Sequence, residues 1–287
     1  MRVLIVGASG QLGRELMKVF ADVDAVGVDH GLVDIERPGA FATALQRHAP
    51  DLVINTAAFH NVELCETQPE RAFAVNALAV DRCAAECALA NVAFAHVSTD
   101  YIFDGEAHEP YDEGAPARPL NAYGVSKYAG ELLIGRSTDR RYVFRTSGLY
   151  GIAGSSTKGY TFIERILQQA AGGKPLRVVE DVTFSPSYAR HVAESMRRIV
   201  ETERYGTYHV TNAGACTWYE FAKEALRRAN ISADVTAVTQ ATFPSLARRP
   251  RYSALAHNAM GRLGMPAAPA WQDGLDAYLA ERVATSR

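Results

Sequence analysis

Residues 3–13 read Val3-Leu4-Ile5-Val6-Gly7-Ala8-Ser9-Gly10-Gln11-Leu12-Gly13, and this stretch decides the fold. Its apolar start is typical of a strand that helices cover on both faces. Of the three evenly spaced glycines, the first permits a tight turn, the second admits a pyrophosphate, and the third lets helix and strand pack closely. A glycine-rich turn that binds nothing is the alternative. We predict that a dinucleotide contacts Gly7, Ser9, Gly10, Gln11, Leu12 and Gly13.

Strand and helix patterns alternate through the first half of the chain. They predict strand 3–6, helix 11–21, strand 25–29, helix 38–48, strand 52–54, helix 69–90, strand 93–99, helix 122–135 and strand 142–146. Strands separated by such helices imply right-handed crossovers and parallel pairing. We therefore expect an α/β protein in which residues 1–150 form a Rossmann-type, doubly wound parallel sheet.

The rhythm loosens after residue 150. Residues 151–159 are rich in Gly and Ser and are expected to form a loop. The later patterns predict helices at 160–171, 187–201, 217–229 and 273–283, strands at 176–179 and 207–211, and irregular structure at 243–252. We expect residues 151–287 to form a smaller, mainly substrate-binding α/β lobe, with helix 187–201 packing back on the first domain.

Composition excludes several classes of function. The formal net charge of the 287 residues is -2, so we expect no nucleic-acid partner. No apolar run approaches the roughly 18 residues of a membrane span, and the chain enters a strand at once, without the pattern of a signal peptide. The four cysteines have neither disulfide nor zinc spacing, and Cys83 and Cys87 are expected to be buried hydrophobes. These features favour a reducing cytoplasm. No cluster of carboxylates indicates a bound metal, so we expect no metal site, and a metal at a dimer interface is the alternative.

Asp29 ends the second predicted strand. A carboxylate there can accept hydrogen bonds from ribose hydroxyls, which favours NAD, and it would repel a 2′-phosphate. His30 follows it, and Arg14 and Arg37 lie nearby, so the choice between NADH and NADPH stays open. An acid that merely ends the strand in a turn is the alternative.

Tyr123 and Lys127 lie four residues apart in a predicted helix and therefore share one face. A phenol is a poor acid–base group at neutral pH, and a neighbouring ammonium should lower its pKa. The matching chemistry is hydride transfer between a nicotinamide and a carbonyl carbon, with Tyr123 giving the proton to the oxygen. A solvated helical pair is the alternative, but the upstream glycine loop favours catalysis.

A hydroxyl should bind the same carbonyl oxygen. Thr99 ends a predicted strand at the edge where open α/β sheets bind ligands, and it is our choice, with Ser98 as the alternative. Asp100 and Tyr101 are candidates for the substrate side. Asp100 can instead cap the following loop.

These residues carry a family resemblance. The glycine spacing resembles that of extended short-chain dehydrogenases/reductases, and Ser98-Thr99-Asp100-Tyr101-Ile102-Phe103-Asp104-Gly105 resembles the signature of dTDP-4-dehydrorhamnose reductases. The resemblance spans nearly the whole chain. It continues through residues 119–124, 144–147, 206–212, 218–222, 248–250 and 269–271.

The resemblance implies an NADPH- or NADH-dependent enzyme that reduces the 4-keto group of a nucleotide-linked 6-deoxy sugar, with dTDP-4-dehydro-L-rhamnose giving dTDP-L-rhamnose. Tyr123 would be the proton donor, Lys127 the ribose-binding lysine and Thr99 the carbonyl-binding hydroxyl. Further cofactor contacts would come from Asp34, Ile35, Ala57, Ala58, Phe59 and Asn76. Substrate contacts would include Gly148, Phe184 and Arg249. A homodimer is compatible with the family.

The chain departs from the family pattern around the sugar. Gly148 stands where many members have a tryptophan that faces the sugar. Residues 59–63 and 184–188 also differ from the usual motifs. The resemblance therefore leaves the accepted sugar open.

Two other functions fit part of the pattern: a related nucleotide-sugar epimerase or dehydratase, and a non-catalytic dinucleotide-binding regulatory subunit. A dehydratase would want an acid pair beside the catalytic hydroxyl, whereas Asp100 is followed by Tyr101. The presence of Thr99, Tyr123 and Lys127 together favours catalysis over binding alone.

Overall fold

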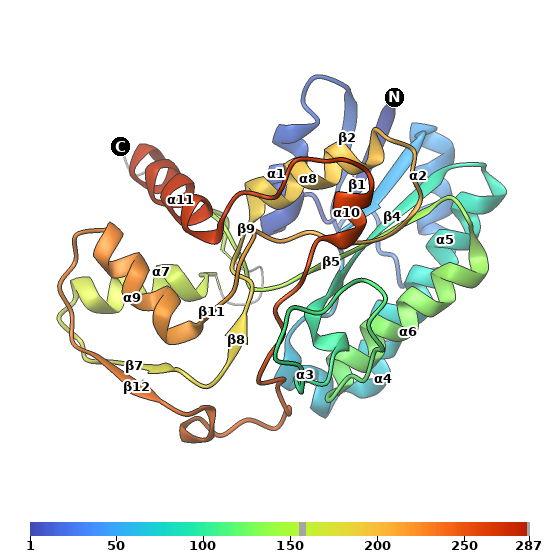
Figure 1. The fold of residues 1–287 in the computed structure, drawn as a ribbon. Coiled ribbons are helices and arrows are strands. Elements are labelled where there is room, and N and C mark those ends of the chain that lie inside the picture. Colours follow the sequence, from blue (N-terminus) through green and yellow to red (C-terminus); the bar gives the residue numbers. More distant parts are fainter. Residues whose placement is uncertain (155–158, 286–287) are drawn as a thin grey trace.

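The apolar runs of the first half pair side by side in a six-stranded parallel sheet (Figure 1). The computed structural model describes residues 1–154 and 159–285, so part of the predicted loop at 151–159 lies outside the described residues. The strand order is β10-β5-β4-β3-β1-β2. The strands are β1 (Arg2–Val6), β2 (Asp24–Val28), β3 (Leu52–Asn55), β4 (Ala93–Thr99), β5 (Arg141–Thr146) and β10 (Gly206–His209). The predicted doubly wound fold is confirmed.

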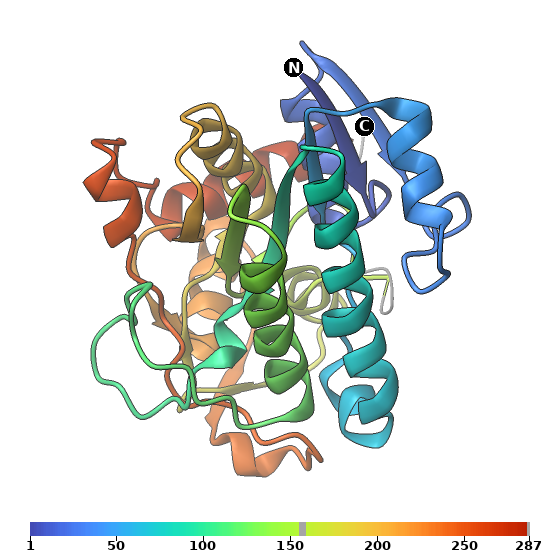
Figure 2. The ribbon, with the colours of Figure 1, turned by 90° about the vertical axis from the view of Figure 1, so that its right-hand side faces the viewer.

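Helices cover both faces of this sheet because alternate strand residues point to opposite sides. Val3 and Ile5 pack with α1 (Gln11–Val19) and α8 (Ala189–Val200). Leu4 and Val6 belong to a second core with α2 (Ala40–His48), α5 (Val80–Leu89) and α6 (Ala122–Ser137). Figure 2 shows α5 and α6, in teal and green, side by side over one face.

The predicted helix 69–90 is not one regular helix. It consists of α4 (Pro69–Phe73), a π-helix at Ala74–Ala79 and α5, and a short helix that we did not predict, α3 (Val62–Thr67), precedes it. Gly130 of α6 lies against the π-helix so closely that a Cβ there would overlap the Asn76 carbonyl oxygen. The widened turn thus sits where two helices meet, and such turns are frequent at functional sites.

The second half builds a smaller lobe with its own core. Its elements are β6 (Leu149–Tyr150), α7 (Phe162–Ala171), β7 (Leu176–Val179), β8 (Thr183–Phe184), β9 (Ser187–Tyr188), β11 (Cys216–Thr217), α9 (Trp218–Arg228), β12 (Val235–Val238) and α11 (Trp271–Thr285). The capping box at Thr217 and Glu220 starts α9.

Two later segments return to the large sheet. α8 packs on α1, and β10 pairs with β5 as the edge strand, next to α10 (Asn258–Arg262). The expected strand at 207–211 is therefore part of the large sheet. The domain boundary near 150 stays a prediction.

Two expectations from composition concern the cysteines and membrane-spanning helices. All four cysteines are free and buried, which confirms the prediction for Cys83 and Cys87. No helix within residues 1–154 and 159–285 has the length and apolar character needed to cross a bilayer.

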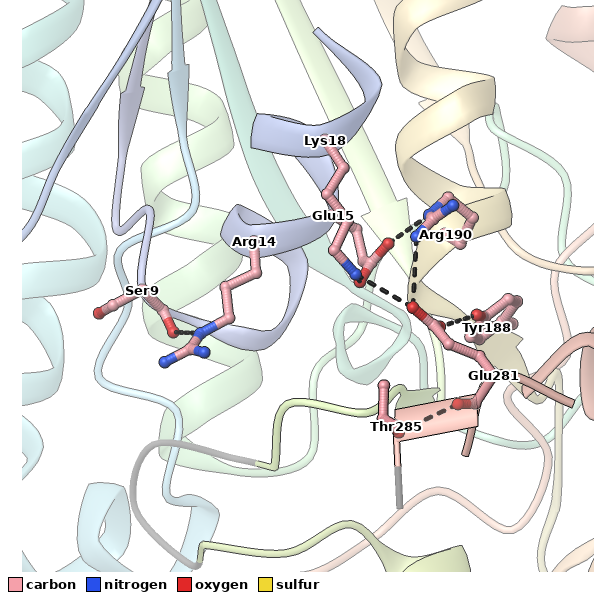
Figure 3. A network of polar contacts seen from close by, with 8 residues as sticks. All are labelled: Ser9, Arg14, Glu15, Lys18, Tyr188, Arg190, Glu281 and Thr285. Atoms are coloured by element: carbon pink, nitrogen blue, oxygen red, sulfur yellow. Dashed lines mark hydrogen bonds and ion pairs between the residues drawn. The ribbon is translucent and has the colours of Figure 1, made fainter. Parts of the chain in front are cut away.

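A polar network ties α11 to the helix that follows the glycine loop (Figure 3). Glu15 on α1 is buried, and its carboxylate contacts Lys18 at 2.8 Å and the Arg190 guanidinium. Glu281 on α11 accepts hydrogen bonds from Lys18 at 3.1 Å, from Arg190 at 3.4 Å and from the Tyr188 hydroxyl. The network thereby joins α1, α8 and α11.

We expect Glu15→Gln to destabilise the protein, because it leaves two cations facing a neutral buried amide. Lys18 and Arg190 keep partial access to water, so the loss should be about 2 kcal/mol, or roughly 4 °C in Tm. Scanning calorimetry measures the shift. Glu194→Gln, at an exposed position on α8, is the matched control. Equal Tm values for the two variants would contradict the network's role.

Candidate active site

The strand order reverses between β1 and β3, and a cleft of about 580 Å³ opens at the carboxyl ends of these strands. Ligands of open α/β sheets bind at such a reversal. The glycine loop, the ends of β2, β3 and β4, the start of α6 and residues 146–149 line this cleft.

The glycine loop has no room for side chains at two positions. Gly7 has φ +82°, and a Cβ there would lie 2.6 Å from Thr56 Oγ1. A Cβ on Gly13 would lie 2.8 Å from Ala8 Cα and overlap the Gly7 carbonyl oxygen. Gly13 does not line the cleft; its role is close packing.

The start of α1 fits an anionic ligand. Its N-cap residue is Gly10, which has no side chain to cap the first backbone N–H groups, and these groups lie beside the cleft. Gln11 lines the cleft, and its buried Nε2 has no hydrogen-bond partner among the described residues. The close-fitting backbone, the uncapped helix and this amide suit the pyrophosphate of a dinucleotide. Ser9, Gly10 and Leu12 line the same wall.

Asp29 joins β2 to the glycine loop. The backbone N–H and the hydroxyl of Ser9 both donate to Asp29 Oδ1 at 2.8 Å. Asp29 and His30 also line the cleft. Arg14 Nε donates to the Ser9 carbonyl oxygen at 2.9 Å (Figure 3). An acid and an arginine therefore flank the same loop, and charge alone does not choose between NADH and NADPH.

Thr99, Tyr123 and Lys127 lie together in the cleft. Thr99 ends β4 and shares a hydrogen bond with Tyr123. The start of α6 is fixed by Asn121, whose side chain accepts from the Gly124 N–H at 2.8 Å. This cap places Tyr123 and Lys127 on one face of the helix, one turn apart.

Ser98, the alternative hydroxyl, is engaged elsewhere. It donates a hydrogen bond to Glu131, which also forms a buried ion pair with Arg145 at 2.7 Å. Thr99 is thus the hydroxyl beside Tyr123.

The proton state of Tyr123 differs from our expectation. Burial raises the pKa of the phenol above its ordinary value, although the hydrogen bond with Thr99 lowers it. The expected lowering by Lys127 is not seen, because the amine is directed elsewhere. Its Nζ donates to the Val97 carbonyl oxygen at 2.7 Å and lies 2.8 Å from His96 Nε2.

Of the other residues that we expected to contact the cofactor, some line the cleft and some do not. Ala57 and Ala58 line it, whereas Asp34, Ile35 and Phe59 do not. Ile35 is buried in the core beneath β2, and the Asp34 carboxylate accepts the Glu36 N–H at 2.9 Å.

Asn76 acts from behind the cleft. This buried side chain in the π-helix accepts from the Phe59 N–H at 2.8 Å and donates to the Phe59 carbonyl at 2.9 Å. It also donates to Ser126 Oγ of α6 at 3.0 Å. Asn76 therefore holds the loop after β3 against the helix that carries Tyr123 and Lys127.

Three of the expected substrate residues line cavities, whereas Tyr101 and Phe184 line neither the main cleft nor its neighbouring pocket. Asp100 and Gly148 line the main cleft. Burial raises the pKa of Asp100, whose carboxylate accepts a hydrogen bond from Ser147 at 2.8 Å. The Tyr101 ring packs edge-on against Tyr123 with 5.9 Å between centroids.

Arg249 lines a neighbouring pocket of about 380 Å³, which shares Gln11, His60 and Leu149 with the cleft. It lies 2.9 Å from the Glu63 carboxylate and hydrogen-bonds Tyr101. The hydrogen bonds from Ser245 and Arg249 lower the pKa of Glu63 to about 2.

Phe184 supports Gly148 from behind and does not line the cleft. Its ring is 2% exposed and stacks on Trp218 with 3.7 Å between centroids. Gly148 has φ +49°, and a Cβ there would overlap this ring. The smaller lobe thus supplies the aromatic ring that backs Gly148.

Sequence reasoning missed several residues of the cleft, among them His60, Thr146, Ser147 and Leu149. They lie at or after the ends of β3 and β5, so the rule that ligands bind at the carboxyl ends of strands could have found them. Thr146 Oγ1 is buried without a partner among the described residues, which suits a polar group of a ligand. Within residues 1–154 and 159–285, no three His, Cys, Asp or Glu side chains lie close enough together to hold a metal ion.

The chain is similar to known proteins over nearly its whole length. The family model described as "RmlD substrate binding domain" matches residues 1–284. A dTDP-4-dehydrorhamnose reductase of Aggregatibacter actinomycetemcomitans is 34% identical over 88% of the chain and 90% of that protein. A probable dTDP-4,6-dihydroxy-2-methyloxan-3-one 4-ketoreductase of Streptomyces antibioticus is 37% identical, covering 96% and 93%. The crystal structure of the Bacillus anthracis dTDP-4-dehydrorhamnose reductase in complex with NADP superposes with a TM-score of 0.93, at 33% identity and 98% and 99% coverage.

We expect Gly13→Ala to weaken dinucleotide binding at least tenfold, since the added methyl forces the glycine loop away from α1. Titration calorimetry with NADPH and NADH measures the Kd. Gly261→Ala is the control, because a Cβ at that helical position meets nothing within 4 Å. An unchanged Kd for Gly13→Ala would contradict the close-packing role.

Proposed function

The chain belongs to the dTDP-4-dehydrorhamnose reductase family, and from this premise we propose that it reduces the 4-keto group of a dTDP-linked 6-deoxy sugar with NADPH or NADH. It is an oxidoreductase, and the reaction we propose converts dTDP-4-dehydro-L-rhamnose to dTDP-L-rhamnose. The observation that carries this proposal is the meeting of Thr99, Tyr123 and Lys127 in one cleft with a glycine loop that fits a pyrophosphate.

The protein's own residues divide the work. The bound dinucleotide supplies the hydride. Tyr123 donates a proton to the developing alkoxide, and Thr99 hydrogen-bonds the same oxygen. Because burial raises its pKa, the phenol holds its proton at neutral pH until the oxygen becomes basic. Lys127 would contact the ribose, and Gly7, Ser9, Gly10, Gln11 and Leu12 would hold the pyrophosphate.

The pocket of about 380 Å³ beside the cleft is available to the nucleotide part of the substrate. Arg249 offers a cation there, beside Glu63, and the pocket shares His60 and Leu149 with the cleft. A diphosphate placed beside Arg249 would direct the sugar toward Tyr101 and Tyr123. We propose this path for the substrate.

The accepted sugar is the least constrained part of the proposal. The Streptomyces antibioticus relative is named for a different keto sugar. Gly148, backed by Phe184, also removes bulk next to the catalytic hydroxyls.

Four free thiols fit a reducing cytoplasm, which we propose as the location. A homodimer stays a prediction.

We expect the protein to oxidise NADPH or NADH when dTDP-4-dehydro-L-rhamnose is added, measured as loss of the reduced-nicotinamide absorbance. dTDP-4-keto-6-deoxy-D-glucose, which differs in configuration, is the comparison substrate. Consumption with neither sugar, in a protein that binds the dinucleotide, would sink the proposed reaction.

We expect Tyr123→Phe to lower kcat by about 10²- to 10⁴-fold while the dinucleotide Kd stays within a factor of about three, because only the proton donor is lost. Steady-state kinetics and calorimetry measure the two effects. Tyr128→Phe, one turn further along α6 and outside the residues that line the cleft, is the matched control. Turnover by Tyr123→Phe at the parent rate would show that another group donates the proton.

A further inference from the structure

A buried line of three side chains runs behind the catalytic tyrosine. Asn55 at the end of β3, His96 in β4 and Lys127 in α6 are 1%, 0% and 1% exposed. Asn55 Nδ2 lies 3.2 Å from His96 Nδ1, and His96 Nε2 lies 2.8 Å from Lys127 Nζ. Of the three, the proposed function uses only Lys127.

The direction of these hydrogen bonds is set at Asn55. The backbone N–H of Ala57 donates to Asn55 Oδ1 at 3.1 Å, so the amide NH₂ must face the imidazole. His96 Nδ1 is then an acceptor, and a neutral imidazole carries its single proton on Nε2. That N–H points at Lys127 Nζ, where only a neutral amine has a lone pair to accept it.

The opposite arrangement has a cost. An ammonium on Lys127 would donate to His96 Nε2 and move the ring proton to Nδ1. Two donors, His96 Nδ1–H and Asn55 Nδ2–H, would then face each other at 3.2 Å in a site without water access. The neutral amine still donates to the Val97 carbonyl oxygen at 2.7 Å, so no partner is lost.

Burial acts in the same direction. It lowers the pKa of Lys127 to about 7 against the opposing charge of Glu131, and it lowers the pKa of His96 well below its ordinary value. The titratable and charged groups that face the amine are His96 from β4 and Glu131 from α6, and Glu131 is itself ion-paired with Arg145 from β5.

We infer that Asn55 and His96 are positioning residues that hold Lys127 as a neutral amine in the cofactor-free protein and thereby set the pH range in which it becomes a cation. The role of Lys127 rests on the proposed function, but its proton state is a property of the free protein.

Lysine Cε resonances test this inference without substrate or dinucleotide. The chain has only five lysines, so ¹³C-lysine labelling gives few signals, and Lys127→Arg assigns the one of interest. We expect Lys127 in the parent protein to titrate with a midpoint about 7. A midpoint above about 10, the ordinary range for lysine, would overturn the inference whatever the activity of the enzyme.

Asn55→Asp tests the direction of the line with an isosteric change. A carboxylate keeps the hydrogen bond from the Ala57 N–H, but it accepts a hydrogen bond from His96 Nδ1–H instead of donating one. The ring proton then lies on Nδ1, and Nε2 becomes an acceptor for an ammonium. We expect the Lys127 midpoint to rise by roughly one unit or more. The kcat profile against pH should shift in the same direction.

His96→Phe distinguishes an effect that the imidazole transmits from Asn55→Asp to Lys127 (a relay) from the direct effect of the added negative charge on Lys127. In a His96→Phe background Asn55→Asp adds the same charge without an imidazole, and the rise should shrink to a small fraction. An equal rise in both backgrounds would show that charge alone moves Lys127 and would overturn the relay. If either variant fails to fold, the parent titration still decides the resting state of Lys127.

Discussion

The close approach of two backbone turns is the constraint on which the rest depends. The glycine loop after β1 and the turn after β3 meet where the sheet reverses its order, and the Thr56 hydroxyl donates to the carbonyl oxygens of Val6 and Gly7 at 2.8 and 3.1 Å. This contact exists only because Gly7 lacks a Cβ. It fixes the floor of the cleft, and every other functional side chain is placed relative to that floor.

The opposite wall is positioned by a second close contact. Gly130 lets α6 rest on the π-helix, and Asn76 binds both Ser126 and the backbone of Phe59. The loop after β3 and the catalytic helix are therefore held by the same side chain. Proton chemistry needs such rigidity, because a donor that moves by 1 Å loses most of its advantage.

Much of this arrangement could be predicted from local pattern. The strands of the large sheet, the glycine loop and the Tyr123–Lys127 spacing all depend on short-range periodicity. The two-residue strands β6, β8, β9 and β11 could not be predicted, since distant pairing alone creates them. The close packing of the π-helix on Gly130 joins segments some 50 residues apart in the sequence. His96 lies in an apolar strand, and the lysine that it contacts is near only in space. Gly148 lines the cleft, and its predicted contact with the substrate stays a prediction; its aromatic support from Phe184 comes from a distant part of the sequence.

The late position of β10 bears on how the protein is made. Strand β5 pairs on one side with β4 and on the other with β10, which lies some 60 residues downstream. While the polypeptide emerges from the ribosome, the nucleotide-binding half therefore carries an unprotected edge until residues 206–209 arrive. An unpaired edge strand of this kind exposes backbone N–H and C=O groups that pair with strands of other chains and promote aggregation. The smaller lobe must be synthesised almost to its midpoint before the sheet is closed, so the two halves mature together rather than in succession.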